Sequence, residues 1–228
     1  MTSLTMRPPR VCNSGTTFWL ALILLIVTWP GPASRSEGQD HLARQVVIVT
    51  PAQSDARFAA AREALAFWNE TLAELQLRPR FLDDKVLVDP PITRSLENYT
   101  RQIWLLAGRP LPYEGAPQTP SDLLAMEGDI VIFFSKQQIF SFAWPFAEHA
   151  RYFIGISTDT TVPLNYPNVT RNVIAHELGH TLGLEHNGNT QTLMCGPCEQ
   201  LLYRSERPVF FSLTPQDRAR LRAMHHAQ

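Results

Sequence analysis

The sequence lacks an excess of charge, an internal repeat and an apolar run long enough to cross a membrane. Its 228 residues carry 20 basic and 21 acidic side chains, so the net charge of −1 gives no electrostatic reason to expect nucleic acid as a partner. The apolar run at residues 18–29 is well short of the ~20 residues of a spanning helix. With 44% hydrophobic residues and no sign of a second domain, the chain is sufficient for one globular core.

The N-terminal segment is typical of a secretory signal peptide. Arg7 and Arg10 precede the apolar run, and small, turn-forming residues follow it. We therefore predict a signal peptide over residues 1–34 and a single domain over residues 35–228. The protein is then exported, either secreted or periplasmic. If the segment is retained, it instead anchors the protein to a membrane with the domain facing outward, and only then is a membrane a partner.

The order of the predicted elements indicates an α+β domain. Strands are expected where β-branched and aromatic residues cluster, and helices where apolar residues recur at helical spacing. The predicted strands are 45–50, 80–88, 130–134 and 151–157, and the predicted helices are 54–77, 96–107, 169–182 and 214 to about 225. Residues 109–127 are rich in Pro, Gly and Ser and indicate a surface loop, while the stretch 140–146 is interpreted as core and cleft edge.

The run from His176 to His186 (HELGHTLGLEH) has the spacing of a zinc site. Because residues four apart lie one above the other on a helix, His176 and His180 can bind the same ion. Gly183 can adopt the positive φ of a sharp helix exit, after which the chain can reverse and supply His186 as third ligand. Three imidazoles leave a fourth tetrahedral position for water, which is typical of a catalytic zinc site. We predict one catalytic Zn²⁺.

Glu177 follows the first histidine and reaches the same region without completing the coordination. Zinc lowers the pKa of its bound water to near neutrality and polarises a carbonyl placed against it. Glu177 would accept the proton of the attacking water and pass it to the leaving amine. The predicted reaction is hydrolysis of a peptide bond without a covalent intermediate. We expect protein or peptide substrates and a monomeric protein.

The extended motif resembles the metzincin clan of zinc peptidases, and residues 172–186 are most similar to the matrixins. Metzincins place a methionine in a tight turn beneath the zinc ligands, and Met194 follows His186 at a suitable distance. The predicted helix after Thr214 stands where matrixins have their C-terminal helix. The resemblance implies a zinc endopeptidase with a mixed twisted sheet, an active-site helix, a Met-turn and a C-terminal helix.

Two matrixin features have no counterpart in this sequence. There is no recognisable prodomain with a cysteine that plugs the zinc. The Asp/Gly-rich loop that binds structural calcium and a second zinc in that family is missing from residues 135–160. We therefore expect the catalytic metal alone and no structural calcium.

Cys195 and Cys198 enclose Gly-Pro, the same four residues as the thioredoxin active site. In an oxidising compartment the default expectation for the pair is a disulfide, and we predict one that stiffens the Met-turn. Redox catalysis, free thiols and a second metal site are the alternatives for these cysteines.

Two other functions remain open beside the peptidase. One is a catalytically silent metal-bound module that recognises an extended peptide or protein, against which the presence of Glu177 argues. The other is an exported thiol–disulfide protein. For the peptidase, we expect an extended substrate to pair with an exposed strand edge over residues 151–157.

Overall fold

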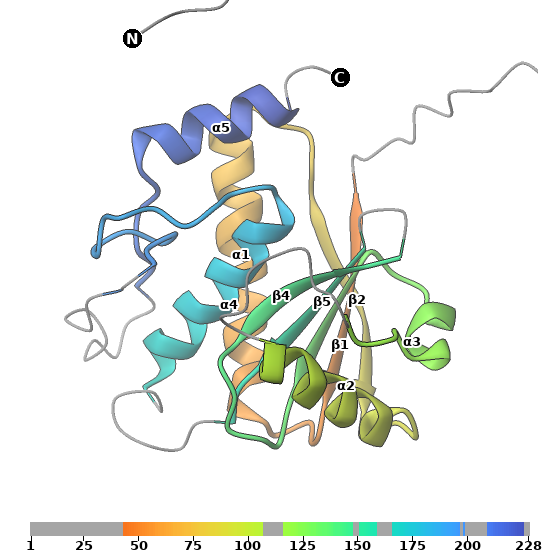
Figure 1. Cartoon of the computed structure of the whole chain (residues 1–228). Helices are drawn as coiled ribbons and strands as arrows, with labels where there is room; N and C mark the ends of the chain where they lie inside the picture. Colours follow the sequence, from red (N-terminus) through yellow and green to blue (C-terminus); the bar gives the residue numbers. More distant parts are fainter. Residues whose placement is uncertain are drawn as a thin grey trace, which may run out of the picture. The chain divides into compact units, whose positions relative to one another are not determined.

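A five-stranded sheet in the order β2-β1-β3-β5-β4 lies at the centre of the domain (Figure 1). In this computed structural model, β1 (Arg44–Thr50), β2 (Phe81–Val88), β3 (Ile130–Phe134) and β5 (Arg151–Ile156) run parallel, and β4 (Phe142–Phe146) is antiparallel to β5. The predicted mixed sheet and the α+β class are confirmed. All five residues of β3 are buried, as expected for a strand covered on both faces.

The structure describes residues 43–106, 116–147, 151–158, 166–196, 198 and 209–225. The predicted signal peptide over residues 1–34 lies outside these ranges. Among the helices within them, none has the length and apolar content that a membrane span requires.

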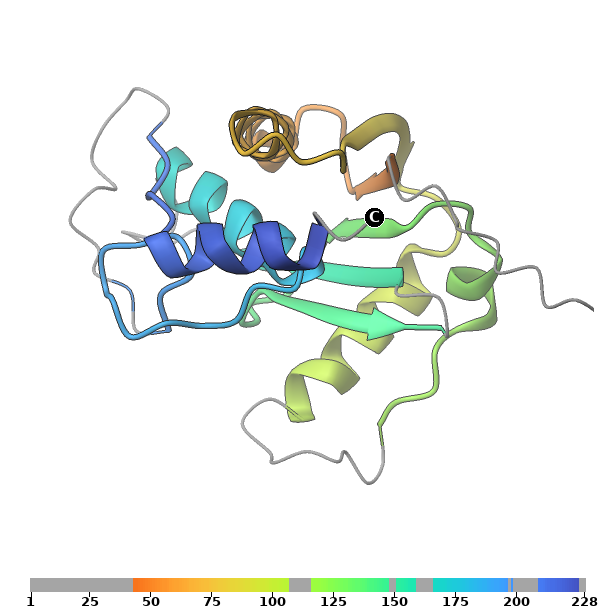
Figure 2. The same ribbon diagram turned by 90° about the horizontal axis from the view of Figure 1, so that it is seen from above.

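Helices cover the two faces of the sheet (Figure 2). α1 (Ala56–Glu74) and α4 (Pro167–Thr181) pack on one face, and α2 (Thr93–Leu106) lies on the other together with the short α3 (Ser121–Ala125). α5 (Pro215–His225) packs on the first face through Leu221. The predicted helices are confirmed, and α3 is a helical turn within the region predicted as a loop.

The sheet separates two hydrophobic clusters. Because successive side chains of a strand point to opposite faces, Val46 and Ile48 of β1 join the cluster beneath α1 and α4, whereas Val47 and Val49 join the cluster beneath α2. Trp68 of α1 is fully buried, and its indole N–H donates to the Ala175 carbonyl of α4 at 2.7 Å. This bond ties the two helices together beneath the region that carries the histidines.

The predicted edge strand is wrong. β5 is paired on both sides, to β3 and to β4, so it presents no free edge. Among the described strands β4 pairs only with β5, so residues 142–146 form the sheet edge on this side, as β2 does on the other side. The sequence of β4 contains Pro145, which lacks a backbone N–H and suits an edge strand but obscures the strand pattern.

Candidate metal centre and cleft

Helix α4 positions the first two histidines and ends at the glycine of the motif. Pro167 stands at the first helical position, where its missing N–H costs nothing, and the helix is capped at Leu182. Gly183 follows with φ of +85°, in the left-handed region that favours glycine, and a side chain there would also overlap Met224. The helix exit predicted from the sequence is therefore present, and it turns the chain back toward α4.

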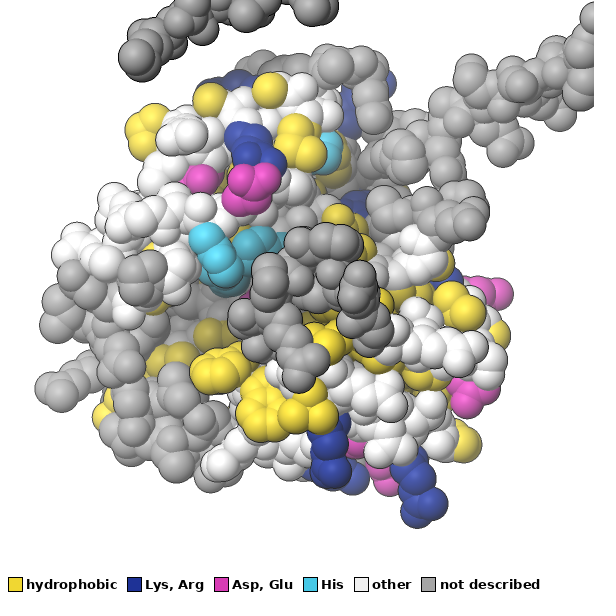
Figure 3. Space-filling view, viewed as in Figure 1, with side chains coloured by type: hydrophobic (Ala, Val, Ile, Leu, Met, Phe, Trp, Pro, Cys, Tyr) yellow, Lys and Arg dark blue, Asp and Glu magenta, His cyan; other side chains and the backbone are white. Residues whose placement is uncertain are grey.

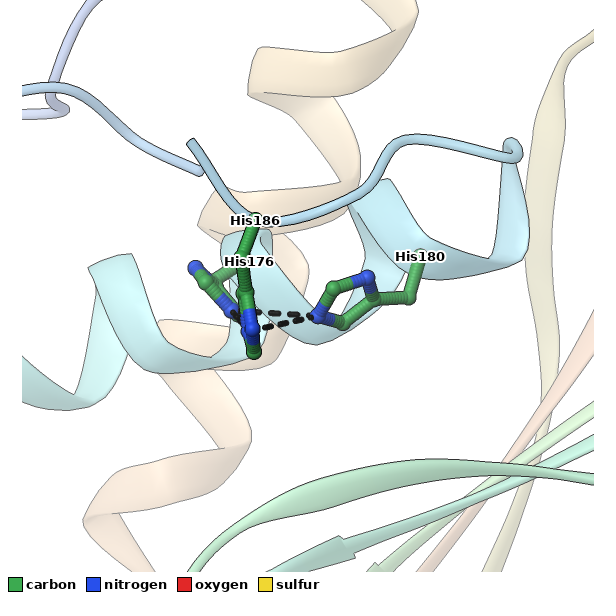
Figure 4. A group of neighbouring side chains, drawn as sticks. All are labelled: His176, His180 and His186. Carbon is green, nitrogen blue, oxygen red and sulfur yellow. Dashed lines mark hydrogen bonds between the residues drawn. The ribbon is translucent and has the colours of Figure 1, made fainter. Parts of the chain in front are cut away.

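Three imidazoles from this segment converge on one point (Figure 4). The Nε2 atoms of His176 and His186 are 3.0 Å apart, and the Nε2 of His180 is 3.2 Å from each of the other two. The Nδ1 atoms of His176 and His180 lie 2.7 and 2.8 Å from the carbonyl oxygens of Leu193 and Leu184. A carbonyl only accepts, so both Nδ1 atoms carry the proton and both Nε2 atoms expose lone pairs to one another.

This donor set fits a zinc ion. Unprotonated nitrogens cannot hydrogen-bond to each other, so their approach is favourable only around a cation. Tetrahedral zinc with Zn–N bonds of about 2.0–2.1 Å separates its nitrogen ligands by roughly 3.3 Å, close to the observed spacing of 3.0–3.2 Å. The second ring nitrogens bind backbone carbonyls, which is how zinc-binding histidines are usually oriented.

Burial keeps the histidines in the form that binds metal. Desolvation lowers the pKa of His176 to about 4, and it also lowers the pKa of His180. The neighbouring imidazoles add to the lowering because a second positive charge nearby is unfavourable. Both rings are therefore neutral at physiological pH in the metal-free protein, and metal does not have to displace protons from them.

Glu177 is buried at the border between the histidines and β4. It lines both cavities of the site, as does His186. Burial raises the pKa of its carboxyl group to about 8, and a hydrogen bond from the backbone of Ala143 in β4 opposes that rise. A cation held by the three imidazoles would favour the ionised carboxylate.

Met194 lies beneath the histidines, completely buried, in the turn predicted for it. A Cβ on Gly179 would come within 2.5 Å of the Met194 sulfur and 3.1 Å of the Trp68 ring, so this helix position is in direct contact with the turn. The preceding residue, Leu193, supplies the carbonyl that orients His176. The turn therefore sets the floor of the site and the rotation of one ligand.

The predicted disulfide is present between Cys195 and Cys198, with the two Cα atoms 5.2 Å apart. Cys195 is buried and forms an isolated bridge with Asn187, the residue after the third histidine. Both cysteines line the larger cavity beside His186. The disulfide thus belongs to the wall of the cleft.

Two cavities meet at Glu177 and His186. The larger has a volume of about 820 Å³ and follows one face of α4 from the histidines toward its N-terminal half, and Asp55 and Arg57 also line it. Its apolar lining includes Ile156, Val169, Val173, Leu193 and Phe211. The smaller, of about 340 Å³, lies between β4 and the end of α2. Figure 3 shows histidine side chains reaching the surface on this side of the molecule.

Three contributors to the site were not predicted from the sequence. Ala143 contacts Glu177 from β4, and Asn187 links the third ligand to the Met-turn through its backbone N–H, which donates to the Met194 carbonyl at 2.7 Å. Asp217 of α5 accepts a hydrogen bond from the Asn187 side chain at 3.2 Å. In the sequence Asp217 stands out only as a capping residue at the start of α5, and this role does not indicate that its side chain bonds to Asn187.

Residues 125–226 match the family described as Peptidase_M10, Matrixin. No curated protein matches the chain significantly. Among solved structures, the chain is similar to archaemetzincin from Methanopyrus kandleri at 15% identity and a TM-score of 0.43, covering 81% of this chain and 97% of that one. It is also similar to metalloproteinase-II from Bacteroides fragilis at 13% identity and a TM-score of 0.44, covering 83% of this chain and 55% of that one.

The two structural likenesses have TM-scores below 0.5 and do not by themselves establish a common fold. The family match spans the region of β3, the edge strand, the histidine helix, the Met-turn and α5. It covers every residue that the motif pointed to, and within it the three histidines are placed to hold a metal ion. Residues 125–226 are therefore similar to the matrixin peptidases, and this stretch includes the three histidines that are placed to hold a metal ion.

Proposed function

We propose that this chain is a zinc-dependent endopeptidase in which Glu177 is the general base. The observation that carries the proposal is the convergence of three Nε2 atoms within 3.0–3.2 Å of one another beside a buried glutamate. A structural zinc site would need a fourth protein ligand, and the described residues offer only His176, His180 and His186. The three histidines line the two cavities, so a zinc ion held by them would be accessible to a substrate there.

The chemistry divides between the metal and one side chain. Bound zinc would polarise the scissile carbonyl and acidify a water molecule. The carboxylate of Glu177 would take a proton from the attacking water, whose oxygen bonds to the carbonyl carbon, and would return the proton to the nitrogen as the C–N bond breaks. Because Glu177 is buried at the junction of the two cavities, a peptide that spans both places its scissile bond beside this carboxylate.

The open edge of β4 is the element best suited to hold an extended substrate. A peptide can add to a sheet edge by main-chain hydrogen bonds, and β4 runs directly past Glu177 at Ala143. One substrate side chain would enter the larger cavity, whose walls at Val173, Leu193 and Phe211 are apolar. We therefore propose a preference for a large apolar residue next to the cleaved bond.

The setting of the enzyme is also a proposal. We propose a single catalytic Zn²⁺ without structural calcium, and a monomer that acts outside the cytoplasm. The disulfide between Cys195 and Cys198 suits an oxidising compartment, as does the signal-like segment over residues 1–34.

The test combines metal analysis with cleavage of a denatured protein. Wild type should bind one zinc per chain, and its activity should be lost to a chelator and restored by zinc. Glu177→Gln should retain the zinc and lose activity by about 10²–10⁴-fold, the contribution of general-base catalysis. Glu70→Gln, which changes an exposed glutamate of α1, is the matched control and should equal wild type.

Each alternative function has its own outcome in this test. A zinc-loaded wild type that cleaves nothing would favour a silent binding module. An absence of cleavage together with thiol–disulfide exchange that the chelator does not affect would favour an exported thiol–disulfide protein. Full activity in Glu177→Gln would remove the role assigned to that residue.

A further inference from the structure

The three histidines are held in different ways. His176 and His180 lie on one helix, and their rings are fixed by backbone carbonyls. His186 is the exposed member of the three and stands outside any helix or strand. Its position depends on the path of the segment from Leu182 to Asn187. A ligand on an irregular segment needs other contacts to hold it in place, because ordering free backbone costs about 1–2 kcal/mol per residue.

α5 contacts both ends of this segment in antiparallel order. At the first end, the Nε2 of His225 donates to the Leu182 carbonyl at 3.2 Å, and the Met224 side chain lies against Gly183. At the other end, eight residues earlier on α5, Asp217 meets the side chain of Asn187. Eight residues of helix span about 12 Å. α5 therefore runs alongside the segment from Leu182 to Asn187 and contacts both of its ends.

The contact between Asp217 and Asn187 is the most constrained of these. Asp217 is buried, and the same carboxylate oxygen that accepts from the Asn187 amide also accepts from the Thr214 N–H at 2.9 Å. The Asp217 N–H donates in turn to the Thr214 hydroxyl at 3.0 Å, which completes a capping box. The acceptor is therefore immobilised by the helix start and cannot follow a movement of the exit segment.

Asn187 is hydrogen-bonded to several other parts of the site besides Asp217. Its backbone N–H donates to the Met194 carbonyl at 2.7 Å, and its backbone carbonyl accepts from Gly196 at 2.9 Å. Its side-chain oxygen accepts from the Thr192 hydroxyl at 3.0 Å. The residue beside the third histidine is thus bonded to the Met-turn on one side and to α5 on the other.

We propose that Asp217 and Asn187 are positioning residues that hold His186 at the metal, so that α5 is a clamp for the third ligand. The proposal rests on the zinc site of the proposed function but concerns metal binding, not cleavage. Second partners of metal ligands typically change metal affinity by 10–100-fold when removed. The ion pair between Arg220 and Glu185 lies between the two anchors, but both side chains are exposed, so it should contribute little.

The experiment measures zinc affinity by competition with a chelating dye, and zinc release after excess chelator is added. Asn187→Ala removes the link and leaves the capping box of α5 intact, so it should weaken zinc binding by about 10–100-fold and speed release. Arg220→Ala, on the same helix, is the matched control and should change the affinity by less than about threefold. The circular dichroism of the metal-free variants should match that of wild type.

A double-mutant cycle separates the clamp from a general loss of stability. If the two residues act as one unit, Asp217→Ala combined with Asn187→Ala should lose no more affinity than the worse single variant. Should Asp217→Ala fail to fold because its cap is lost, Asn187→Ala alone decides. Unchanged zinc affinity in Asn187→Ala, or an equal loss in Arg220→Ala, would overturn the proposal.

The outcome is independent of catalysis. A zinc-loaded chain that cleaves no peptide would contradict the proposed function and leave the clamp standing. A wild-type chain that binds no zinc at these histidines would overturn both.

Discussion

The two faces of the central sheet are built with different interactions. Beneath α2 the cluster is dominated by aromatic packing, with the Phe153 ring 5.5 Å from Tyr99 and 6.0 Å from both Phe133 and Phe142. Beneath α1 and α4 the apolar cluster is combined with directional bonds to backbone groups. Asn172 of α4, for example, donates to the Val209 carbonyl at 2.7 Å.

Apolar burial and hydrogen bonds make different contributions: the first stabilises the fold, and the second also fixes the positions of side chains. Burial of apolar area is non-directional, so the aromatic cluster holds α2 on the sheet without fixing side-chain angles. The hydrogen bonds that Glu97 of α2 accepts from Ser135 and Lys136 involve no residue of the metal site. Hydrogen bonds to the backbone fix both distance and angle. The face that carries the histidines therefore uses both kinds of interaction, and substitutions on the two faces should differ more in their effect on the site than in their effect on stability.

The largest effect is expected from truncating one large buried ring on each face. Trp68→Ala and Phe153→Ala should each lower the free energy of unfolding by about 3–5 kcal/mol. Only Trp68→Ala should also weaken zinc binding, because the indole bonds to Ala175 and packs against Gly179 between the ligand positions. Denaturant unfolding of the metal-free variants, with zinc competition alongside, measures both. Equal loss of zinc affinity in Phe153→Ala would contradict the distinction between the faces.

A smaller effect is expected from pH, and it should come from the histidine face. In the metal-free protein the pKa of Glu177 is raised to about 8, above its value in the unfolded chain. Between pH 6 and 8 the folded state binds more protons than the unfolded state, so stability falls as pH rises, by about 2 kcal/mol across this window. Glu177→Gln should remove that fall.

The pH dependence that comes from His176 falls in a different pH range from that of Glu177 and can be separated from it. The pKa of this histidine is lowered to about 4, so its contribution to stability is lost as pH falls below about 6.5 and does not act above it. Unfolding curves of wild type and Glu177→Gln that stay parallel from pH 6 to 8 would show that Glu177 is not buried as described.

The last comparison concerns a matched pair of polar substitutions, one on each face of the sheet. Asn172 bonds to Val209 and also accepts from the Phe211 N–H at 2.8 Å, so Asn172→Ala should cost about 1–3 kcal/mol and loosen the cavity wall at Phe211. Within the described residues, the buried Thr100 hydroxyl of α2 has no hydrogen-bond partner. Thr100→Val should therefore be neutral or stabilise by up to about 1 kcal/mol.

Cleavage of a peptide library by Asn172→Ala and Thr100→Val tests whether each face of the sheet shapes the substrate cleft. Asn172→Ala should raise KM for substrates with a large apolar residue next to the cleaved bond and leave zinc affinity unchanged. Thr100→Val should leave the profile as it is in wild type. A changed profile in Thr100→Val would show that the α2 face also shapes the cleft.

The parts of the site that follow from short-range spacing were predictable from the sequence. His176 and His180 share a helix face because they are four residues apart, and Gly183 supplies the left-handed exit that no side chain favours. The capping residues Thr214 and Asp217 mark the start of α5 for the same reason. Each of these signals is contained within one or two helical turns.

The parts that depend on contacts between distant segments were not predictable. The strand Phe142–Phe146 contains a proline and no alternating pattern, so its pairing with β5 and its place at the edge could not be inferred. For the same reason the edge was wrongly assigned to residues 151–157. The bond between Asn187 and Asp217 joins residues 30 apart, and nothing in either residue type specifies the other.

Gly179 illustrates how the unspecified positions of a motif are still constrained. Its α-carbon lies so close to the buried Met194 that a side chain at position 179 would need the space that the methionine fills. Over evolutionary time the two positions should therefore vary together. In related chains, a larger residue at the position of Gly179 should be accompanied by a smaller or displaced side chain at the position of Met194, and an alignment would show this as a correlated pair fifteen residues apart.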